Sequence, residues 1–240
     1  MPPKQRRKAA PAARKTGRPA KRAASGKVRA AAVPAPERSG VLKPSAAASS
    51  ASTPERARVL SSRLVFEGPL FRVSRDRIVE PTGLETVRDV VRHNGSVVIL
   101  AVDKSSKKKD PWIVMERQYR HAANQFLWEI PAGKMEPGEE PLAAARRELA
   151  EETGYQARKW KPLATYYASP GFVGEAMLLY LAEDLYPGTT NPDEDERIEL
   201  RLVRFSEILK MIEQGAIHDG KTLNAVLLYA WLQGRKRKKK

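Results

Sequence analysis

Three glutamates, Glu148, Glu151 and Glu152, stand close together in the sequence and could bind a divalent cation. On a helix, their spacing of i, i+3 and i+4 places the three carboxylates on one face. Like charges at such short range repel and raise one another's pKa unless a cation holds them ionised. Carboxylate oxygens are hard ligands that suit Mg²⁺ or Mn²⁺, and these ions commonly bind substrate phosphates as well. The three glutamates therefore predict a metal site that acts on a phosphorylated substrate.

A solvated helix face is the ordinary alternative, because many charge runs only pair with neighbouring cations. Arg146, Arg147 or Lys159 could serve as such partners. Two observations favour the metal site. Gln156 stands where Glu152 would need a cationic partner at i+4. The carboxylates also lie near the end of the predicted helix, where the macrodipole disfavours anions.

The helix that carries these glutamates is expected to begin at Pro141 and to end at Gly154, which are typical start and stop residues. An apolar stripe should seat the helix on a core, and it consists of Leu142, Ala145 and Leu149. Glu139 stands just before the helix, and an ion pair with Arg147 could fix the preceding loop against it.

Segment 133–155 (GKMEPGEEPLAAARRELAEETGY) resembles the Nudix box, the motif of the Nudix hydrolase family. In that motif a glycine, five residues, a glutamate and seven residues precede Arg-Glu-aliphatic-x-Glu-Glu-x-Gly and a bulky apolar residue. Every fixed position is filled, namely by Gly133, Glu139, Arg147, Glu148, Leu149, Glu151, Glu152, Gly154 and Tyr155. A pattern with so many fixed positions is far more specific than a lone glycine-rich motif. The resemblance implies an α/β fold, the Nudix α/β/α sandwich with a mixed sheet.

Composition divides the 240 residues into three parts. Residues 1–58 carry 15 Lys and Arg against two glutamates and contain no Phe, Trp, Tyr or Ile. Such a segment has too little apolar surface to offset its chain entropy, so we expect a disordered basic tail. Residues 59–234 can form one compact domain with its own core. A second basic tail follows at 235–240.

Hydrophobic patterning predicts an N-terminal antiparallel strand region and then a mixed sheet with helices against it. We expect strands at 63–66, 71–79, 86–92, 96–102, 112–116, 163–167, 176–181 and 200–205. The continuous apolar run 96–102 suggests a central buried strand. Ser206 is expected to cap a helix that reaches about residue 214. Asp219 or Thr222 should open a last helix that ends at Gly234.

Residues outside the box resemble the ADP-ribose and ADP-sugar pyrophosphatase subgroup of the family. Segment 129–134 (EIPAGK) is similar to the stretch that precedes the box in that subgroup. Pro170 stands sixteen residues after Gly154, near the spacing of a proline that marks the subgroup, although Pro170 and Gly171 could instead form an ordinary loop turn. The resemblance implies hydrolysis of the diphosphate of ADP-ribose, or of a related ADP-sugar, to AMP and ribose 5-phosphate. Another nucleotide sugar, NADH or a dinucleoside polyphosphate is the alternative substrate.

The resemblance also implies roles for single residues. Glu148, Glu151 and Glu152, with the carbonyl of Ala132, would hold Mg²⁺, for which Mn²⁺ could substitute, and loss of Glu152 should abolish hydrolysis. Metal ions there would neutralise the diphosphate and lower the pKa of the attacking water. Gly133, Glu139, Arg147 and Gly154 would shape the box.

Substrate contacts would come from outside the box. Arg120 is the candidate for the diphosphate, because a planar guanidinium can donate two parallel hydrogen bonds. Arg88 resembles a second substrate arginine, and either arginine could instead be an ordinary exposed strand residue. Glu129 matches a glutamate near the adenine or ribose end. On the acidic loop 193–196, Glu194 is the candidate general base and Glu196 is its alternative.

The resemblance implies a homodimer in which N-terminal strands exchange. Phe66 and Phe71 lie in that region and could stack on adenine, or they could belong to the core. The chain contains no cysteine, which excludes disulfides and thiolate metal sites, and its three histidines are scattered. No apolar run approaches transmembrane length, so we expect a cytoplasmic protein without a membrane partner.

The basic tails raise a second class of function. Segment 15–22 (KTGRPAKR) resembles an AT-hook, a minor-groove binder, although Thr16 replaces its usual leading arginine. Non-specific attraction to nucleic-acid phosphates needs only the charge, and a solubilising tail is the alternative. A nucleic-acid-associated protein whose Nudix domain mainly binds is the remaining possibility, but a pure binder has no need for the complete set of metal glutamates.

Overall fold

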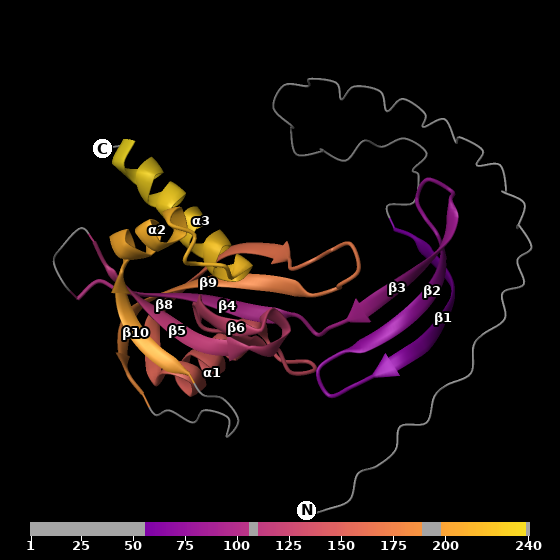
Figure 1. Ribbon diagram of the computed structural model, residues 1–240, viewed down its shortest axis with the longest axis horizontal. Helices are drawn as coiled ribbons and strands as arrows, with labels where there is room; N and C mark the ends of the chain where they lie inside the picture. Colours follow the sequence, from indigo (N-terminus) through magenta and orange to yellow (C-terminus); the bar gives the residue numbers. More distant parts are fainter. Residues whose placement is uncertain (1–55, 106–109, 189–197, 239–240) are drawn as a thin grey trace, which may run out of the picture. The chain divides into compact units, whose positions relative to one another are not determined.

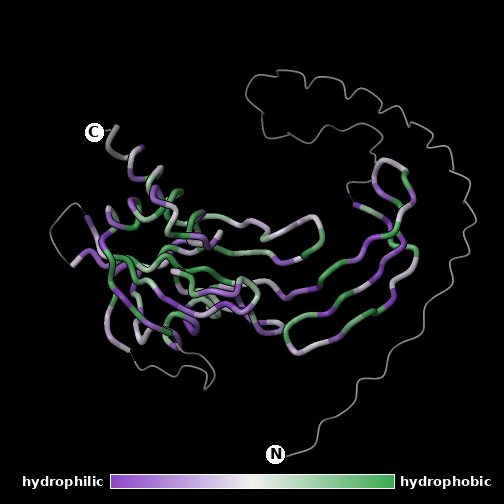
Figure 2. The backbone as a smooth tube through the Cα atoms, in the orientation of Figure 1, coloured by the Kyte–Doolittle hydropathy of each residue, from purple (hydrophilic) through white to green (hydrophobic). Residues whose placement is uncertain are grey.

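The computed structural model describes residues 56–105, 110–188 and 198–238 (Figure 1). The N-terminal strands form a three-stranded antiparallel sheet of β1 (Arg58–Glu67), β2 (Arg72–Val79) and β3 (Glu85–Arg92). This confirms the predicted N-terminal antiparallel region. Both hydrophobic and hydrophilic stretches lie along these strands (Figure 2), yet all ten residues of β1 are exposed. This sheet therefore leaves apolar side chains uncovered in the single chain.

The larger sheet has seven strands in the order β10-β5-β4-β9-β8, with β6 paired to β5 and β7 paired to β4. Its central pair, β4 and β9, is parallel, whereas the other pairs are antiparallel, so the predicted mixed sheet is confirmed. The strands are β4 (Ser96–Asp103), β5 (Trp112–Arg120), β6 (Gln125–Glu129), β7 (Ala132–Lys134), β8 (Tyr155–Tyr167), β9 (Ala176–Pro187) and β10 (Glu199–Arg204).

Helices cover both faces of the larger sheet, as Figure 1 shows. They are α1 (Pro141–Thr153), α2 (Phe205–Glu213) and α3 (Gly220–Lys238). Residues of β4 alternate between the two layers. Val97 and Ile99 pack in one cluster with Leu149 of α1. Val98 and Leu100 pack in the other with residues of α2 and α3. Residues 97–102 are fully buried, which confirms both the central strand and the α/β/α sandwich.

The start of α2 differs from the prediction. Arg204, not Ser206, is the N-cap residue, and no side chain of the helix caps its own end. Ser206 instead donates its N–H and its hydroxyl to the Asp110 carboxylate, at 2.9 and 2.7 Å. The predicted Ser206 cap is wrong because the carboxylate at this helix end comes from Asp110, which stands two residues before β5 and is distant in sequence. Asp110 thereby ties α2 to the sheet.

The last helix begins as predicted but ends later. The Asp219 carboxylate accepts hydrogen bonds from the N–H and the hydroxyl of Thr222, at 2.9 and 2.6 Å. Asp219, not Thr222, therefore opens α3. The predicted end at Gly234 is wrong, because α3 continues to Lys238. Glycine inside a helix costs only about 1 kcal/mol relative to alanine, and the lysines and arginines that follow suit a helix C-terminus. No helix in the described ranges has the length and apolar character needed to cross a bilayer.

Candidate catalytic site

Helix α1 begins and ends at the residues predicted for it. Pro141 occupies the first turn, and Gly154 ends the helix in the left-handed conformation with φ of 68°. Side chains other than glycine avoid that conformation. The fully buried Ala145 and Leu149 hold one side of α1 against β4, while Leu142 is only half-buried. The glutamates Glu148 and Glu151 are thus carried on a helix that is fixed by its apolar face and by both ends.

Arg147 lies at the centre of the acidic residues of α1. Its Nε and Nη2 atoms donate to the two carboxylate oxygens of Glu139, each at 3.0 Å, which confirms the predicted ion pair. Its Nη1 atom donates to Glu148 at 2.8 Å and to Glu151 at 2.9 Å. These hydrogen bonds lower the pKa of Glu139 and raise that of Arg147. One guanidinium therefore offsets the repulsion among three carboxylates. Arg147 is also the cationic partner that these glutamates would need on an ordinary solvated helix face.

Glu152 lies deeper than the other acids of α1 and faces β7. It is 7% exposed, and its Oε2 atom accepts a hydrogen bond from the backbone N–H of Ala132 at 3.1 Å. Gly133 follows directly, and a Cβ atom added there would lie 1.9 Å from the Cδ atom of Glu148. Only glycine therefore leaves the Glu148 carboxylate its present place against β7.

A cavity of about 310 Å³ is lined by these groups, including Ala132, Gly133, Glu148, Glu151 and Glu152. Within the described ranges, no three acidic or imidazole side chains converge on one point as a ready-made metal cage. Mg²⁺ does not require such a cage, since it is usually held by one or two carboxylates together with water and substrate phosphates. Three carboxylates and a backbone segment around one cavity fit that requirement.

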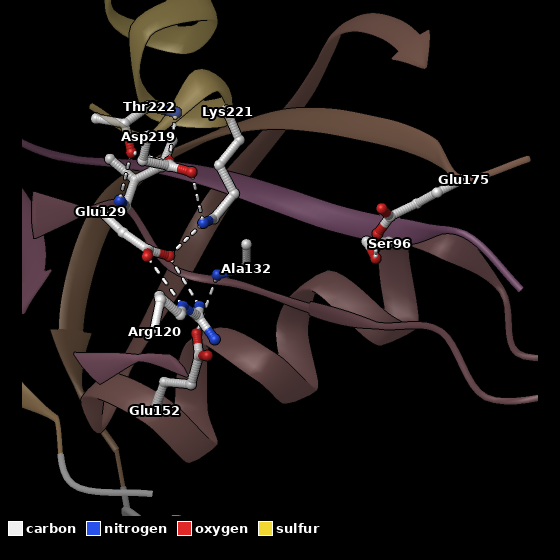
Figure 3. Close-up of polar contacts among 10 residues, drawn as sticks. Ser96, Arg120, Glu129, Ala132, Glu152, Glu175, Asp219, Lys221 and Thr222 are labelled. Carbon is white, nitrogen blue, oxygen red and sulfur yellow. Dashed lines mark hydrogen bonds and ion pairs between the residues drawn. The ribbon is translucent and has the colours of Figure 1, made fainter. Parts of the chain in front are cut away.

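Arg120, at the end of β5, forms a bidentate ion pair with Glu129, at the end of β6. Nε donates to Oε1 at 2.9 Å and Nη2 donates to Oε2 at 2.8 Å. Figure 3 shows the guanidinium between the carboxylates of Glu129 and Glu152. The ammonium of Lys221, in the first turn of α3, also contacts Glu129 and lies 3.1 Å from a carboxylate oxygen of Asp219. Two cations and two anions thus alternate along one network.

This network keeps a buried carboxylate ionised. Glu129 is only 2% exposed. Burial alone raises its pKa, but the hydrogen bonds from Arg120 and the charge and hydrogen bond of Lys221 outweigh burial and leave the pKa lowered. The hydrogen bonds to Glu129 raise the pKa of Arg120, burial opposes this, and the charges of Glu129, Glu152 and Asp219 add to the increase. Arg120 is therefore a fixed positive charge beside the acids of α1.

Other predicted site residues lie elsewhere or have other partners. Arg88, on β3, donates to Glu80 at 2.5 Å and to Thr86 at 2.9 Å, and it is exposed. Pro170 is exposed, in a loop where the N–H of Phe172 donates to the carbonyl of Ser169 at 3.2 Å, the i+3 bond of a β-turn that has Pro170 and Gly171 at its centre. Glu194 and Glu196 lie outside the described residues, and so does segment 15–22.

Phe66 and Phe71 lie on the surface of the single chain. They are 51% and 39% exposed, and their ring centroids are 5.6 Å apart. The alternative that they belong to the core is therefore wrong for this chain. Phe71 lines a cavity of about 270 Å³ together with Arg72 and Arg92.

Lys221 is the network residue that the sequence did not reveal. It is 11% exposed and contacts two acids, although it stands in the first turn of a helix, where the macrodipole disfavours a cation. A cation at a helix N-terminus was the one sign in the sequence that Lys221 has acidic partners. The same macrodipole argument drew attention to the acids at the end of α1.

Known proteins are similar to this chain in sequence and in fold. A sequence model of the NUDIX domain matches residues 92–226. The chain is 36% identical over 171 residues to the ADP-ribose pyrophosphatase of Bacillus subtilis (strain 168), which covers 70% of this chain and 90% of that protein. It is 40% identical over 127 residues to the ADP-ribose pyrophosphatase of Mycobacterium tuberculosis (strain ATCC 25618 / H37Rv). This match covers 52% of this chain and 59% of that protein. A crystal structure of an ADP compounds hydrolase has the same fold, with a TM-score of 0.63 and 23% identity, and covers 76% of this chain and 97% of that one.

Proposed function

This chain belongs to the NUDIX family, and we propose that it hydrolyses the diphosphate of ADP-ribose, or of a related ADP-sugar, to AMP and ribose 5-phosphate. The observation that carries the chemistry is the cavity lined by Glu148, Glu151 and Glu152, with Arg120 beside it. The substrate is supported by the two similar proteins named ADP-ribose pyrophosphatase.

Mg²⁺ is the proposed cofactor, and Mn²⁺ could replace it. Glu148, Glu151 and Glu152, with the carbonyl of Ala132, would hold it at the cavity described above. When bound, a divalent cation neutralises diphosphate charge and lowers the pKa of the attacking water. In the free protein, Arg147 offsets the repulsion between the carboxylates of Glu148 and Glu151, because its Nη1 atom donates to both.

Arg120 is proposed to bind the diphosphate of the substrate. Glu129 accepts one N–H from Nε and one from Nη2, so the second N–H of Nη2 and both N–H groups of Nη1 remain for phosphate oxygens. Both oxygens of Glu129 are engaged, and the residue is 2% exposed. We therefore assign Glu129 the role of holding Arg120 in place instead of a direct contact with adenine. A preorganised cation of this kind stabilises charge without reorganising during the reaction.

Two further roles remain proposals. Glu194, with Glu196 as the alternative, would act as the general base on the attacking water from its loop. A homodimer would cover exposed apolar side chains of the N-terminal sheet, where Leu64, Val65 and Phe66 are between 50% and 54% exposed. An exposed apolar patch of this kind is typical of a protein interface. Sedimentation at several protein concentrations tests the dimer, and a monomer at every concentration would exclude it.

A substrate panel tests the proposed function. The full chain is incubated with Mg²⁺ and ADP-ribose, GDP-mannose, NADH or diadenosine pentaphosphate, and nucleoside monophosphate release is measured. We expect kcat/KM for ADP-ribose to exceed that of each competitor by about tenfold or more, since a site that hydrogen-bonds one substrate rejects analogues that leave its polar groups unpaired. A higher kcat/KM for another compound would assign the enzyme to that substrate.

A further inference from the structure

A second cavity, of about 600 Å³, lies between α1, the first residues of β8 and the end of β9. Its lining includes Arg146 and Arg147 from α1, Arg158 and Trp160 from β8, and Tyr186 from β9. Of these residues only Arg147 also lines the cavity of the candidate catalytic site. The second cavity is therefore a separate place on the molecule, and neither the metal ligands nor the substrate arginines proposed above belong to it.

Two of its three guanidinium groups are available to an anion. Arg146 is exposed, and among residues 56–105, 110–188 and 198–238 it has no ion-pair partner. Arg158 is 61% exposed, and its 3.6 Å approach to Asp184 is too long for a direct hydrogen bond. Arg147, in contrast, is fully engaged by glutamates and by the backbone carbonyl of Lys134. Paired guanidinium groups at one cavity are suited to a phosphate.

The same cavity offers flat apolar surfaces. The guanidinium carbon of Arg158 lies 4.4 Å from the ring centroid of Tyr186, so the two groups stack. The indole N–H of Trp160 donates to the carbonyl of Ala157 at 2.9 Å, which satisfies the only polar group of the ring. Two small apolar residues, Ala150 and Ala157, also line the cavity. Aromatic rings and guanidinium planes are the groups on which proteins stack nucleobases.

We propose that this cavity is a second ligand site and that it takes a purine nucleoside monophosphate. The phosphate binds Arg146 and Arg158, and the base stacks on the indole ring of Trp160. The cavity volume lies in the range of small-ligand pockets. A bare phosphate would use the arginines but would gain nothing from the rings, so the ligand has both an anionic and an aromatic part.

Titration of the full chain with AMP tests this site. The local probe is the indole N–H resonance of Trp160 in a ¹⁵N-labelled sample, assigned by its loss in Trp160→Phe. EDTA is present throughout, so that catalysis does not contribute. We expect a saturable shift of this resonance, and about tenfold weaker binding in Arg146→Ala/Arg158→Ala, because two charge-assisted hydrogen bonds are lost. Turnover of ADP-ribose without added AMP should be the same in this double variant as in the original chain.

Two control variants make the result specific. Lys159→Ala removes the neighbouring cation on β8, which approaches Asp184 at 3.5 Å. Lys159 lines a different cavity that Trp160 also borders, so this variant tests whether the shift comes from binding there. Arg120→Lys alters the candidate catalytic site but keeps a cation beside the buried Glu129. Both variants should keep the shift and its midpoint. An absent shift, a midpoint that the double arginine variant leaves unchanged, or inorganic phosphate binding as tightly as AMP would each overturn the proposal.

Discussion

Arg120 and Glu129 face each other through two parallel hydrogen bonds, Nε to Oε1 at 2.9 Å and Nη2 to Oε2 at 2.8 Å. This geometry fixes the plane of the guanidinium, because rotation about the side chain would break both bonds at once. Glu129 is itself held from behind by Lys221 at the start of α3. The position of Arg120, the proposed substrate-binding cation, thus depends on α3, a helix that follows the acidic helix α1 by more than sixty residues.

Arg120→Lys tests the importance of this fixed plane. Lysine keeps the charge but cannot donate two parallel hydrogen bonds to one carboxylate. We expect kcat/KM for ADP-ribose to fall by about 10²-fold, comparable to the loss of one preorganised donor in an active site. Arg117→Lys, on the same strand, is the control and should change the rate little. A reduction confined to less than about threefold would mean that Arg120 does not contact the reacting diphosphate.

Lys221→Met should destabilise the fold. The substitution removes a cation that is 11% exposed and that contacts Glu129, which is 2% exposed, and Asp219. A buried charge that loses its partner costs about 3 kcal/mol of stability. Urea unfolding measures this loss. In a double-mutant cycle with Glu129→Gln the two losses should not add, because each variant disrupts the same ion pair. Lys159→Met, whose side chain is 73% exposed, should stay within about 0.5 kcal/mol of the original chain. Additive losses would contradict the coupling.

Stability should depend on pH through Glu129. Burial raises its pKa, but Arg120 and Lys221 outweigh that effect, so the pKa in the folded state is below the ordinary value. The unfolded chain then binds this proton more readily, and the ionised network stabilises the fold fully above about pH 4.3, the ordinary value for glutamate. This contribution is lost as the pH falls through the lower folded pKa. The difference in unfolding free energy between the original chain and Glu129→Gln should therefore shrink at acidic pH, and a difference that grows there would refute the assignment.

Gly133→Ala should separate stability from activity. The added Cβ would meet the Glu148 carboxylate at 1.9 Å, and this carboxylate is the mobile end of a side chain that can move away. We expect a stability loss below about 1 kcal/mol and a fall in turnover of about 10²-fold, because a metal ligand is displaced. Gly234→Ala is the control, since its Cβ would meet nothing within 4 Å. Unchanged turnover in Gly133→Ala would show that Glu148 is not required where it now lies.

Local features of the site were predictable from the sequence, whereas contacts between distant segments were not. Pro141, Gly154 and the Glu139–Arg147 pair all follow from neighbours within a few turns of one helix. Lys221 reaches Glu129 across 92 positions, and Ser206 reaches Asp110 across 96, so no local pattern marks either contact.

The sheet shows the same division. The continuous apolar run of β4 was sufficient to predict a central strand. The first residues of β8, Tyr155 to Lys161, are largely polar and were not predicted as strand. They are strand because β9 supplies an antiparallel partner for them. The short strands β6 and β7 were missed for a related reason, since they are defined by pairing with β5 and β4.

The most direct test of the central claim is the rate of AMP release from ADP-ribose in the presence of Mg²⁺, compared between the original chain and Glu152→Gln. Glutamine can still accept the hydrogen bond that the Ala132 N–H now donates to Glu152, so the fold should be retained and can be checked by circular dichroism. We predict turnover that EDTA abolishes and Mg²⁺ restores, and a loss of about 10³-fold in Glu152→Gln. Full turnover by Glu152→Gln, or no AMP release by the original chain, would contradict the assignment of the acidic helix as the catalytic site.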